Sequence, residues 1–121
     1  MNLALWVVAG LLAAVYLGAG LMKATQPKEK LRKNLPWVDD FSARTVRFIG
    51  VAEIAGALGL VLPQLTGIAP VLTPIAAVGL VIVQALAIRT HLRRGEKQVL
   101  PANAALLLLA LFVAVGRLAG L

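Results

Sequence analysis

The chain has 121 residues, of which 60% are hydrophobic and only 14% are charged. A soluble domain carries about 25% charged residues because its surface must be hydrated, so the composition excludes an ordinary soluble enzyme and favours a membrane protein. The net charge of +7 does not indicate nucleic-acid binding, because the basic residues are confined almost wholly to two short segments between apolar stretches. The chain has no cysteine, which excludes disulfides and thiolate metal sites.

The first apolar segment, residues 3–22, predicts a transmembrane helix. It contains no charged residue, and a helix needs about 20 residues to cross a hydrocarbon core about 30 Å thick. Lys23 follows the segment, whereas a signal peptide has its basic residues before the apolar run. We therefore expect a membrane-spanning helix rather than a cleaved signal.

The uncharged stretch 54–88 is too long for one crossing, so two helices share it. Its middle, residues 63–70, contains prolines and a glycine, which interrupt helices and form turns. We expect one helix over 44–62 and the next over 70–91, with Thr73 as a candidate N-cap followed by a proline.

Residues 100–118 predict the fourth helix, in which Pro101 is tolerated in the first turn. The expected fold is all-α, a bundle of four transmembrane helices. We expect a single domain over residues 1–121.

The orientation of this bundle follows from Lys and Arg in the short connections, because cytoplasmic loops are enriched in these residues. Basic residues are concentrated in 23–44 and 89–97, and the connection around Gln64 has none. We therefore expect both basic connections in the cytoplasm and both termini outside it, in a multi-pass protein of the cell (inner) membrane.

The first connection carries apolar residues between its charges. They are Leu31, Leu35, Trp37, Val38 and Phe41. Tryptophan is typical of the membrane–water interface, so we expect a short amphipathic element on the membrane surface. The alternative is a solvated basic loop that only fixes the topology.

Glu53 is the strongest candidate for a functional residue. It lies ~13 Å along the second helix, near the middle of the bilayer, where an ionised carboxylate is costly unless it is paired, protonated or hydrated. Its helical neighbours include Gly50, Gly56 and Ala57, which let another helix approach closely. We expect the side chain to point into the bundle. The alternative is a structural ion pair with Arg47 or with a neighbouring helix.

Further polar residues lie at two depths along the predicted helices. Those near the middle are Tyr16, Glu53 and Gln84, and those nearer the cytoplasm are Lys23, Arg47, His91 and Asn103. Together they predict a ligand-binding polar pocket open to the cytoplasm. The alternatives are structural: snorkelling for Arg47, an interfacial position for His91, and packing or interhelical hydrogen bonds for the others.

Rows of small residues at four-residue intervals predict close helix packing. The first helix has Gly10, Ala14 and Gly18, and the fourth has Ala110 and Ala114. Such rows let two backbones approach each other in a membrane. We expect both rows to face neighbouring helices.

No catalytic constellation is complete in the sequence. The only serine, Ser42, lies in the first connection, and no phosphate-binding glycine loop is present. The only histidine, His91, does not make a metal site by itself. We therefore expect no catalytic residues, no metal and no autonomous catalytic activity.

The polar positions resemble those of the DoxX-like family of small four-helix membrane proteins, which are common in bacteria. The matching features are Tyr16–Gly20 with Lys23, the Arg-x-x-Gly-x-x-Glu motif from Arg47 to Glu53, His91 with Gly95-Glu96, Asn103 and Arg117. The resemblance covers essentially the whole chain. The Arg-x-x-Gly-x-x-Glu motif is its most specific part.

What the resemblance implies about function is diverse. Some members look like membrane subunits of quinone-linked sulfur oxidation, and others are implicated in membrane-associated oxidative-stress complexes. A distantly similar eukaryotic branch includes NACHO, a receptor-assembly chaperone. The lack of cysteine argues against autonomous thiol chemistry, and a shared fold does not select an activity.

Three hypotheses about function follow. The first is a binding or assembly protein that holds a lipid, a quinone-like molecule or a partner's transmembrane helix in the pocket around Glu53. The second is a redox subunit in which Glu53 and His91 relay protons to a quinone, and the third is a small transporter. The expected partners are the lipid bilayer and a membrane protein or second copy of the chain, without nucleic acid.

Overall fold

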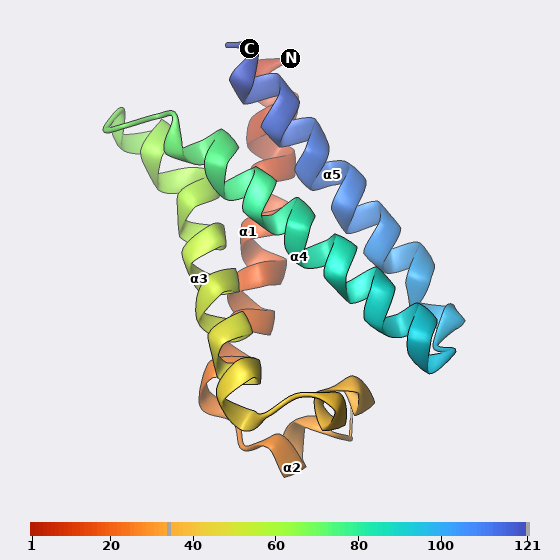
Figure 1. The fold of residues 1–121 in the computed structure, drawn as a ribbon. Helices are drawn as coiled ribbons and strands as arrows, with labels where there is room; N and C mark the ends of the chain where they lie inside the picture. Colours follow the sequence, from red (N-terminus) through yellow and green to blue (C-terminus); the bar gives the residue numbers. More distant parts are fainter. Residues whose placement is uncertain (34, 121) are drawn as a thin grey trace.

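The computed structural model describes residues 1–33 and 35–120, and the regular elements in these ranges are all helical (Figure 1). Four helices are long and apolar enough to cross a membrane, which confirms the predicted all-α fold. They are α1 (Asn2–Thr25), α3 (Ala43–Thr66), α4 (Leu72–Arg94) and α5 (Leu100–Leu118). The shorter elements are α2 (Lys28–Leu31), η1 (Pro36–Asp40) and η2 (Lys97–Val99).

The long helices pack in two pairs. α1 packs most extensively against α3, and α4 packs against α5; contacts between α3 and α4 and between α1 and α5 join the pairs. Both termini and the α3–α4 turn lie at one end of the bundle, here called the termini end (Figure 1). α2, η1 and the α4–α5 connection lie at the opposite end, here called the basic end. Both basic connections are therefore at the same end of the molecule.

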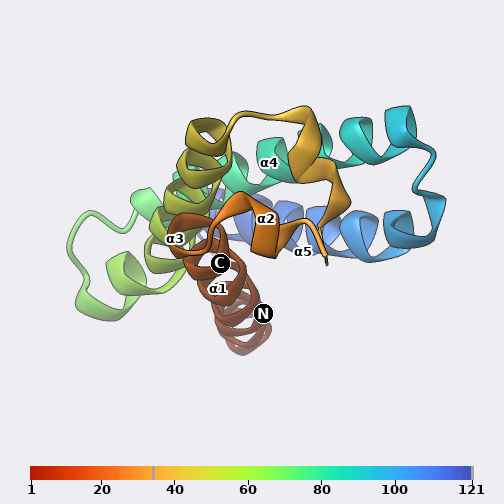
Figure 2. The ribbon, with the colours of Figure 1, turned by 90° about the horizontal axis from the view of Figure 1, so that it is seen from below.

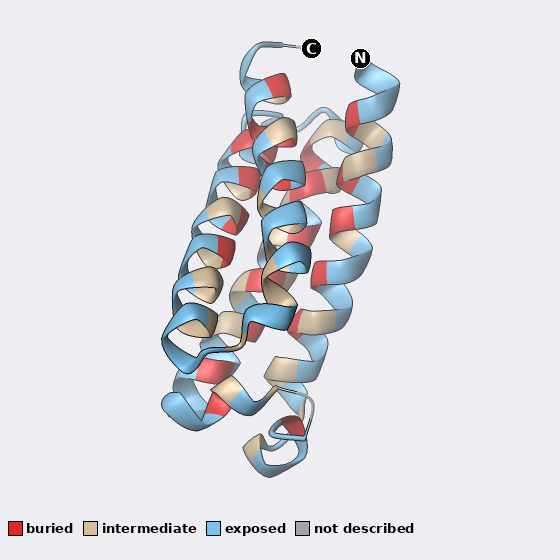
Figure 3. Ribbon diagram, turned by 90° about the vertical axis from the view of Figure 1, so that its right-hand side faces the viewer, coloured by how far each residue is buried: buried red, intermediate tan, exposed pale blue. Residues whose placement is uncertain are grey.

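Each long helix has a buried and an exposed set of residues (Figure 3). The inner core draws on all four long helices, and it contains Leu12, Ala57 and Leu80 together with the predicted row Ala110 and Ala114. Large apolar side chains also cover much of the outside. A water-soluble bundle rarely exposes so much contiguous apolar surface, so the outer surface suits the hydrocarbon of a bilayer.

α3 extends beyond the end that its sequence predicts. It was expected to end near Leu62, but it continues through Pro63 to Thr66 and ends at Gly67, whose φ is 72°. Pro63 lacks only one backbone N–H donor, and its ring is buried in the bundle. The N–H of Gly67 donates to the Pro63 carbonyl at 3.0 Å and closes the last turn. Glycine, and not proline, therefore ends this helix.

The predicted N-cap role of Thr73 is wrong. α4 begins at Leu72 and is preceded by Val71, so Thr73 already lies inside the first turn. Its side chain is buried, and its hydroxyl has no hydrogen-bond partner in the described part of the chain. Thr73 therefore packs within the bundle near its termini end.

α1 and α3 touch backbone to backbone at two glycines. A Cβ added to Gly20 would lie 2.6 Å from the Gly50 carbonyl oxygen, and one added to Gly50 would lie 2.6 Å from the Ala24 nitrogen. Real Cβ atoms do not approach so closely, so neither position has room for a side chain at this helix separation. The contact fixes the height of α1 relative to α3.

The small-residue row of α1, by contrast, faces outward. A Cβ added to Gly10 or Gly18 would have no neighbour within 4 Å, and Ala14 is exposed. The reason is helical phase, because the buried positions of α1, Tyr16 among them, lie on another side of the helix. The prediction that this row packs against a neighbouring helix of the bundle is wrong.

The first basic connection folds against the bundle. Leu31, Val38 and Val46 form a buried cluster, against which Trp37 and Phe41 pack. In Figure 2, which shows the molecule from below, α2 and η1 lie across the basic end of the bundle. The described part of the connection thus contains short helical elements with a buried apolar cluster and is not merely a solvated loop; its place on the membrane surface stays a prediction.

Polar contacts connect neighbouring elements at both ends of the bundle. At the basic end, Arg94 of α4 donates to Asp40 of η1 at 2.8 Å, which links the two basic connections. At the termini end, Arg117 of α5 donates to Asn2 of α1 at 2.9 Å and lies 5.5 Å from the centre of the Trp6 ring. These contacts hold α5 to α1 and the first connection to α4.

Candidate functional site

A lysine–glutamate ion pair joins α1 and α3 inside the bundle. Lys23 Nζ donates to Glu53 Oε1 at 2.7 Å. The Glu53 side chain is only 3% exposed and that of Lys23 is 12% exposed. Glu53 therefore points into the bundle, and its partner is a residue of a neighbouring helix, which was one of the alternatives left open by the sequence. Arg47 is not its partner.

The helix contact at Gly50 lets Lys23 reach Glu53. A Cβ added to Gly50 would lie 2.8 Å from the Lys23 Cβ, so the missing side chain leaves room for the base of the lysine. The amine then reaches Glu53, which lies one turn further along α3. The amine is also 5.4 Å from the centre of the Trp37 ring of η1, within the range of a cation–π contact.

Tyr16 of α1 and Gln84 of α4 complete the group around this ion pair. They are 1% and 5% exposed, respectively. The Tyr16 hydroxyl lies close to the side chains of Gln84 and Glu53. However, neither this hydroxyl nor Gln84 Oε1 makes a hydrogen bond within residues 1–33 and 35–120. We call Tyr16, Lys23, Glu53 and Gln84 the polar layer.

His91 and Asn103 lie outside the polar layer. His91 is near the end of α4, with its Nδ1 atom 3.0 Å from Glu96 Oε1, and Arg94 donates to the same carboxylate. Asn103, in the first turns of α5, is half-buried, and its Nδ2 atom has no partner in the described part of the chain. Neither residue makes a hydrogen bond to the polar layer there. The predicted pocket residues therefore divide into separate groups.

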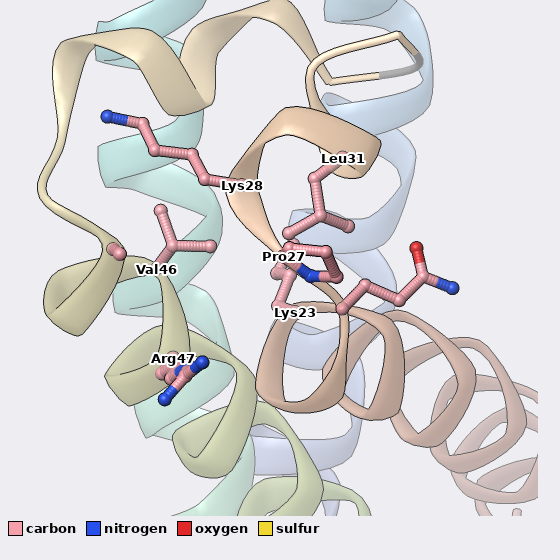
Figure 4. Close-up of a pocket in the computed structure, with 8 residues that line it drawn as sticks. Lys23, Pro27, Lys28, Leu31, Val46 and Arg47 are labelled. Atoms are coloured by element: carbon pink, nitrogen blue, oxygen red, sulfur yellow. The ribbon is translucent and has the colours of Figure 1, made fainter.

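Arg47 also stands apart from the polar layer. It is exposed near the start of α3, and it has no ion-pair or hydrogen-bond partner among the residues that the structure describes. It lines a cavity at the basic end together with Lys23 (Figure 4). Lys23 is thus the residue shared by the ion pair and this cavity.

Two cavities lie along the α1–α3 pair, and neither is lined by Tyr16, Glu53 or Gln84. The cavity at the basic end, here called the basic cavity, has a volume of only about 20 Å³. The second, here called the apolar groove, has a volume of about 210 Å³. Its lining residues are Ala13, Ala14, Leu17, Ala57, Leu58, Val61 and Leu62.

The polar layer offers hydrogen-bonding groups. No three residues of the metal-binding types His, Cys, Asp and Glu come together in the described ranges. The polar layer instead offers an unpartnered hydroxyl from Tyr16 and an unpartnered acceptor from Gln84, beside an ion pair whose charges cancel. Such a set suits an uncharged polar group that both donates and accepts hydrogen bonds.

Sequence reasoning missed the contacts of Lys23 and the role of Trp37. A lysine at the rim of a transmembrane helix is expected to extend toward the interface, whereas Lys23 reaches a carboxylate inside the bundle. One signal was available, because Gly20 and Gly50 each precede an ionisable residue by three positions. Nothing in the spacing indicated that Trp37 would approach the amine.

Comparison with known proteins identified one family. The sequence profile described as the DoxX-like family matches residues 7–113, which include the polar layer, Arg47, His91 and Asn103. The match is to the family as a whole and does not single out a branch of it. No curated protein and no solved structure matched the chain.

Proposed function

The chain belongs to the DoxX-like family, and from that premise we propose that it is a binding protein of the membrane. In this proposal, the polar layer holds the head group of a small membrane-soluble molecule, quinone-like or lipid, between α1, α3 and α4. The four candidate spans and the apolar exterior make the chain an integral membrane protein. The ligand is the part that is proposed.

The observation that carries the proposal is the pair of unpartnered polar atoms beside the ion pair. Leaving a buried donor or acceptor without a partner costs about 1–3 kcal/mol, and the Tyr16 hydroxyl and Gln84 Oε1 are both in this state. A polar head group placed between them would satisfy both atoms. Its binding would therefore recover free energy that the unliganded layer has lost.

The charge balance of the polar layer favours an uncharged head group. Lys23 and Glu53 neutralise each other at 2.7 Å, so the layer attracts neither anions nor cations strongly. A quinone-like ring fits this balance, because in its reduced form one hydroxyl would accept from Tyr16 and donate to Gln84, and in its oxidised form a carbonyl oxygen would accept from Tyr16. Lys23 also lines the basic cavity, so movement of its side chain would connect the layer with that cavity.

The proposal is tested by purifying the full chain in mild detergent and analysing the bound molecules by mass spectrometry. Tyr16→Phe removes only the unpartnered hydroxyl, so the variant should fold normally and lose about tenfold in ligand occupancy. Thr73→Val is the matched control, because it also removes a buried, unpartnered hydroxyl, but one near the other end of the bundle. Occupancy that is unchanged in Tyr16→Phe, or equally lowered in Thr73→Val, contradicts the proposal.

The same experiment separates the other functions. A stoichiometric quinone that is lost in Glu53→Gln favours a redox subunit, whereas a lipid without any redox-active molecule rules that subunit out. Co-purification of a partner membrane protein, or dimerisation of the chain, in place of any small molecule points to an assembly role. Substrate flux into proteoliposomes that does not change in Glu53→Ala excludes a transporter whose substrate site uses Glu53.

We also place the basic end of the bundle in the cytoplasm and the termini outside it, in the cell (inner) membrane. Support comes from the position of both basic connections at one end (Figure 1) and from the enrichment of Lys and Arg in cytoplasmic loops.

A further inference from the structure

The basic cavity contains positive charge that the protein itself does not neutralise. Three of its lining residues are cations, Lys23, Lys28 and Arg47, and none is a carboxylate. Lys23 is paired with Glu53, but Lys28 and Arg47 have no ion-pair or hydrogen-bond partner through their side chains in the described ranges. In Figure 4, Lys28 from α2 and Arg47 from α3 lie on either side of Val46, and their charged ends point in different directions.

The acidic residues that form ion pairs at the basic end form them outside the basic cavity. Asp39 accepts a hydrogen bond from Arg32, Asp40 accepts one from Arg94, and Glu96 interacts with His91 and Arg94. None of these three carboxylates lines the basic cavity, and neither does Glu29, which follows Lys28 in α2. The cavity is therefore complementary to an anion that comes from outside the chain.

Arg47 also lies in line with the apolar groove. Arg47 and Leu58 are eleven residues apart, which at 100° per residue puts them about 20° apart on the helix and ~16 Å apart along it. Leu58 lines the groove together with Ala14 and Leu17 of α1. Residues Val51 and Ile54, which lie between them on α3, are apolar. One face of the α1–α3 pair thus carries a cation at its basic end and an apolar groove further along.

The spacing of these features matches the dimensions of one membrane leaflet. Half of a hydrocarbon core about 30 Å thick is ~15 Å, close to the ~16 Å between Arg47 and Leu58. A phospholipid whose head group lies at Arg47 has an acyl chain of about this length, so it would contact both. Arginine also binds phosphate through two parallel hydrogen bonds.

We infer that the outer face of α1 and α3 binds one anionic phospholipid, with its phosphate at Arg47, at the end of the bundle that also carries the unpartnered cation Lys28, and an acyl chain in the apolar groove. This site differs from the polar layer, because it uses the outer face of the α1–α3 pair and a charged head group; the two share only Lys23, whose amine is paired with Glu53. A free anion would use the cavity alone, and a transmembrane helix would need no cations. The phospholipid is the occupant that uses both features.

Native mass spectrometry of the full chain, released from an equimolar mixture of phosphatidylglycerol and phosphatidylcholine with identical acyl chains, tests the inference. We expect one phosphatidylglycerol to be retained in preference to phosphatidylcholine. Replacing both Lys28 and Arg47 by Gln should lower that preference about tenfold, since each cation near the membrane surface contributes to the attraction. The matched control replaces Arg89 and Lys97, two exposed cations of the second basic connection, by Gln and should retain the preference.

A second variant tests the acyl chain separately. Ala14→Leu places a larger side chain in the groove at an exposed position, so it should lower retention without changing any charge. Equal retention of both lipids, equal loss in the control, or full displacement by water-soluble glycerol phosphate overturns the inference. Tyr16→Phe should leave phosphatidylglycerol retention unchanged, so failure of this site is distinguishable from failure of the polar layer.

Discussion

At the scale of single residues, the main polar feature of the bundle interior is the Lys23–Glu53 ion pair. Removing two charges from water is costly, and a buried pair recovers this only with good geometry. Here the amine and carboxylate are 2.7 Å apart, and the Trp37 ring lies near the amine. Removing one partner leaves the other charge buried without compensation, which destabilises the protein more than removing both charges.

We therefore predict that single and double substitutions at this pair have opposite consequences. Lys23→Met should destabilise the protein by about 3–5 kcal/mol, because Glu53 is left unpaired in the bundle. The double variant Lys23→Met with Glu53→Leu should recover most of that loss. Unfolding by SDS in mixed micelles, followed by circular dichroism, measures both changes. Additive losses in the double variant would show that the two residues are not coupled.

The direction of Glu53 could be predicted from the sequence, but its partner could not. The small neighbours of Glu53 indicated a face where another helix approaches, and the side chain is indeed buried there. The identity of the partner depends on the height of α1 relative to α3, which the contact between Gly20 and Gly50 fixes. No spacing within one helix contains that information.

At the scale of elements, the close crossing of α1 and α3 positions the polar layer. Gly20 and Gly50 let the two backbones touch, and this brings the base of Lys23 beside α3. Close packing at small residues is a main source of helix association in membranes, where lipid is as apolar as the helix surface. The crossing therefore has to be preserved for the ion pair to form.

Gly20→Ala should separate the helices at this crossing. Its Cβ would meet the Gly50 oxygen at 2.6 Å, so we expect a loss of about 1–3 kcal/mol of stability from overpacking. Gly18→Ala, two residues away, has open space around its Cβ and should be neutral or up to about 1 kcal/mol stabilising, as alanine is the better helix former. Thermal denaturation in detergent compares the two variants. Equal effects would mean that the crossing does not depend on Gly20.

The positions of the long helices were largely predictable from the sequence. The features that differ from the prediction have physical reasons. Apolar stretches of about 20 residues locate the four long helices, because the bilayer sets their length. The end of α3 was missed because Pro63 is accommodated inside the helix and Gly67 terminates it. The outward position of Gly10 and Gly18 was missed because a row of small residues does not show which side of the helix is buried.

At the scale of the whole molecule, charge and apolar surface are arranged along one axis. The two basic connections share an end, and they are joined by the Arg94–Asp40 ion pair. The opposite end has few charges, with Arg117 held by Asn2 and Trp6. This asymmetry is the feature from which orientation in the membrane follows.

Reporter fusions check that orientation. Alkaline phosphatase, which is active only outside the cytoplasm, should be active when it is fused to the C-terminus of the chain. The same reporter fused after Gly95, in the second basic connection, should be inactive and serves as the control. Activity in the Gly95 fusion but not in the C-terminal one would invert the assigned topology.

The four spans also constrain how this chain can be duplicated. The four candidate spans of the described residues are an even number, so Asn2 and Arg117 lie at the same end of the bundle. There Arg117 Nη1 donates to Asn2 Oδ1 at 2.9 Å. Two copies joined in tandem would therefore enter the membrane in the same direction. The product would be a parallel repeat, with an axis along the membrane normal, and not the inverted repeat on which many transporters are built.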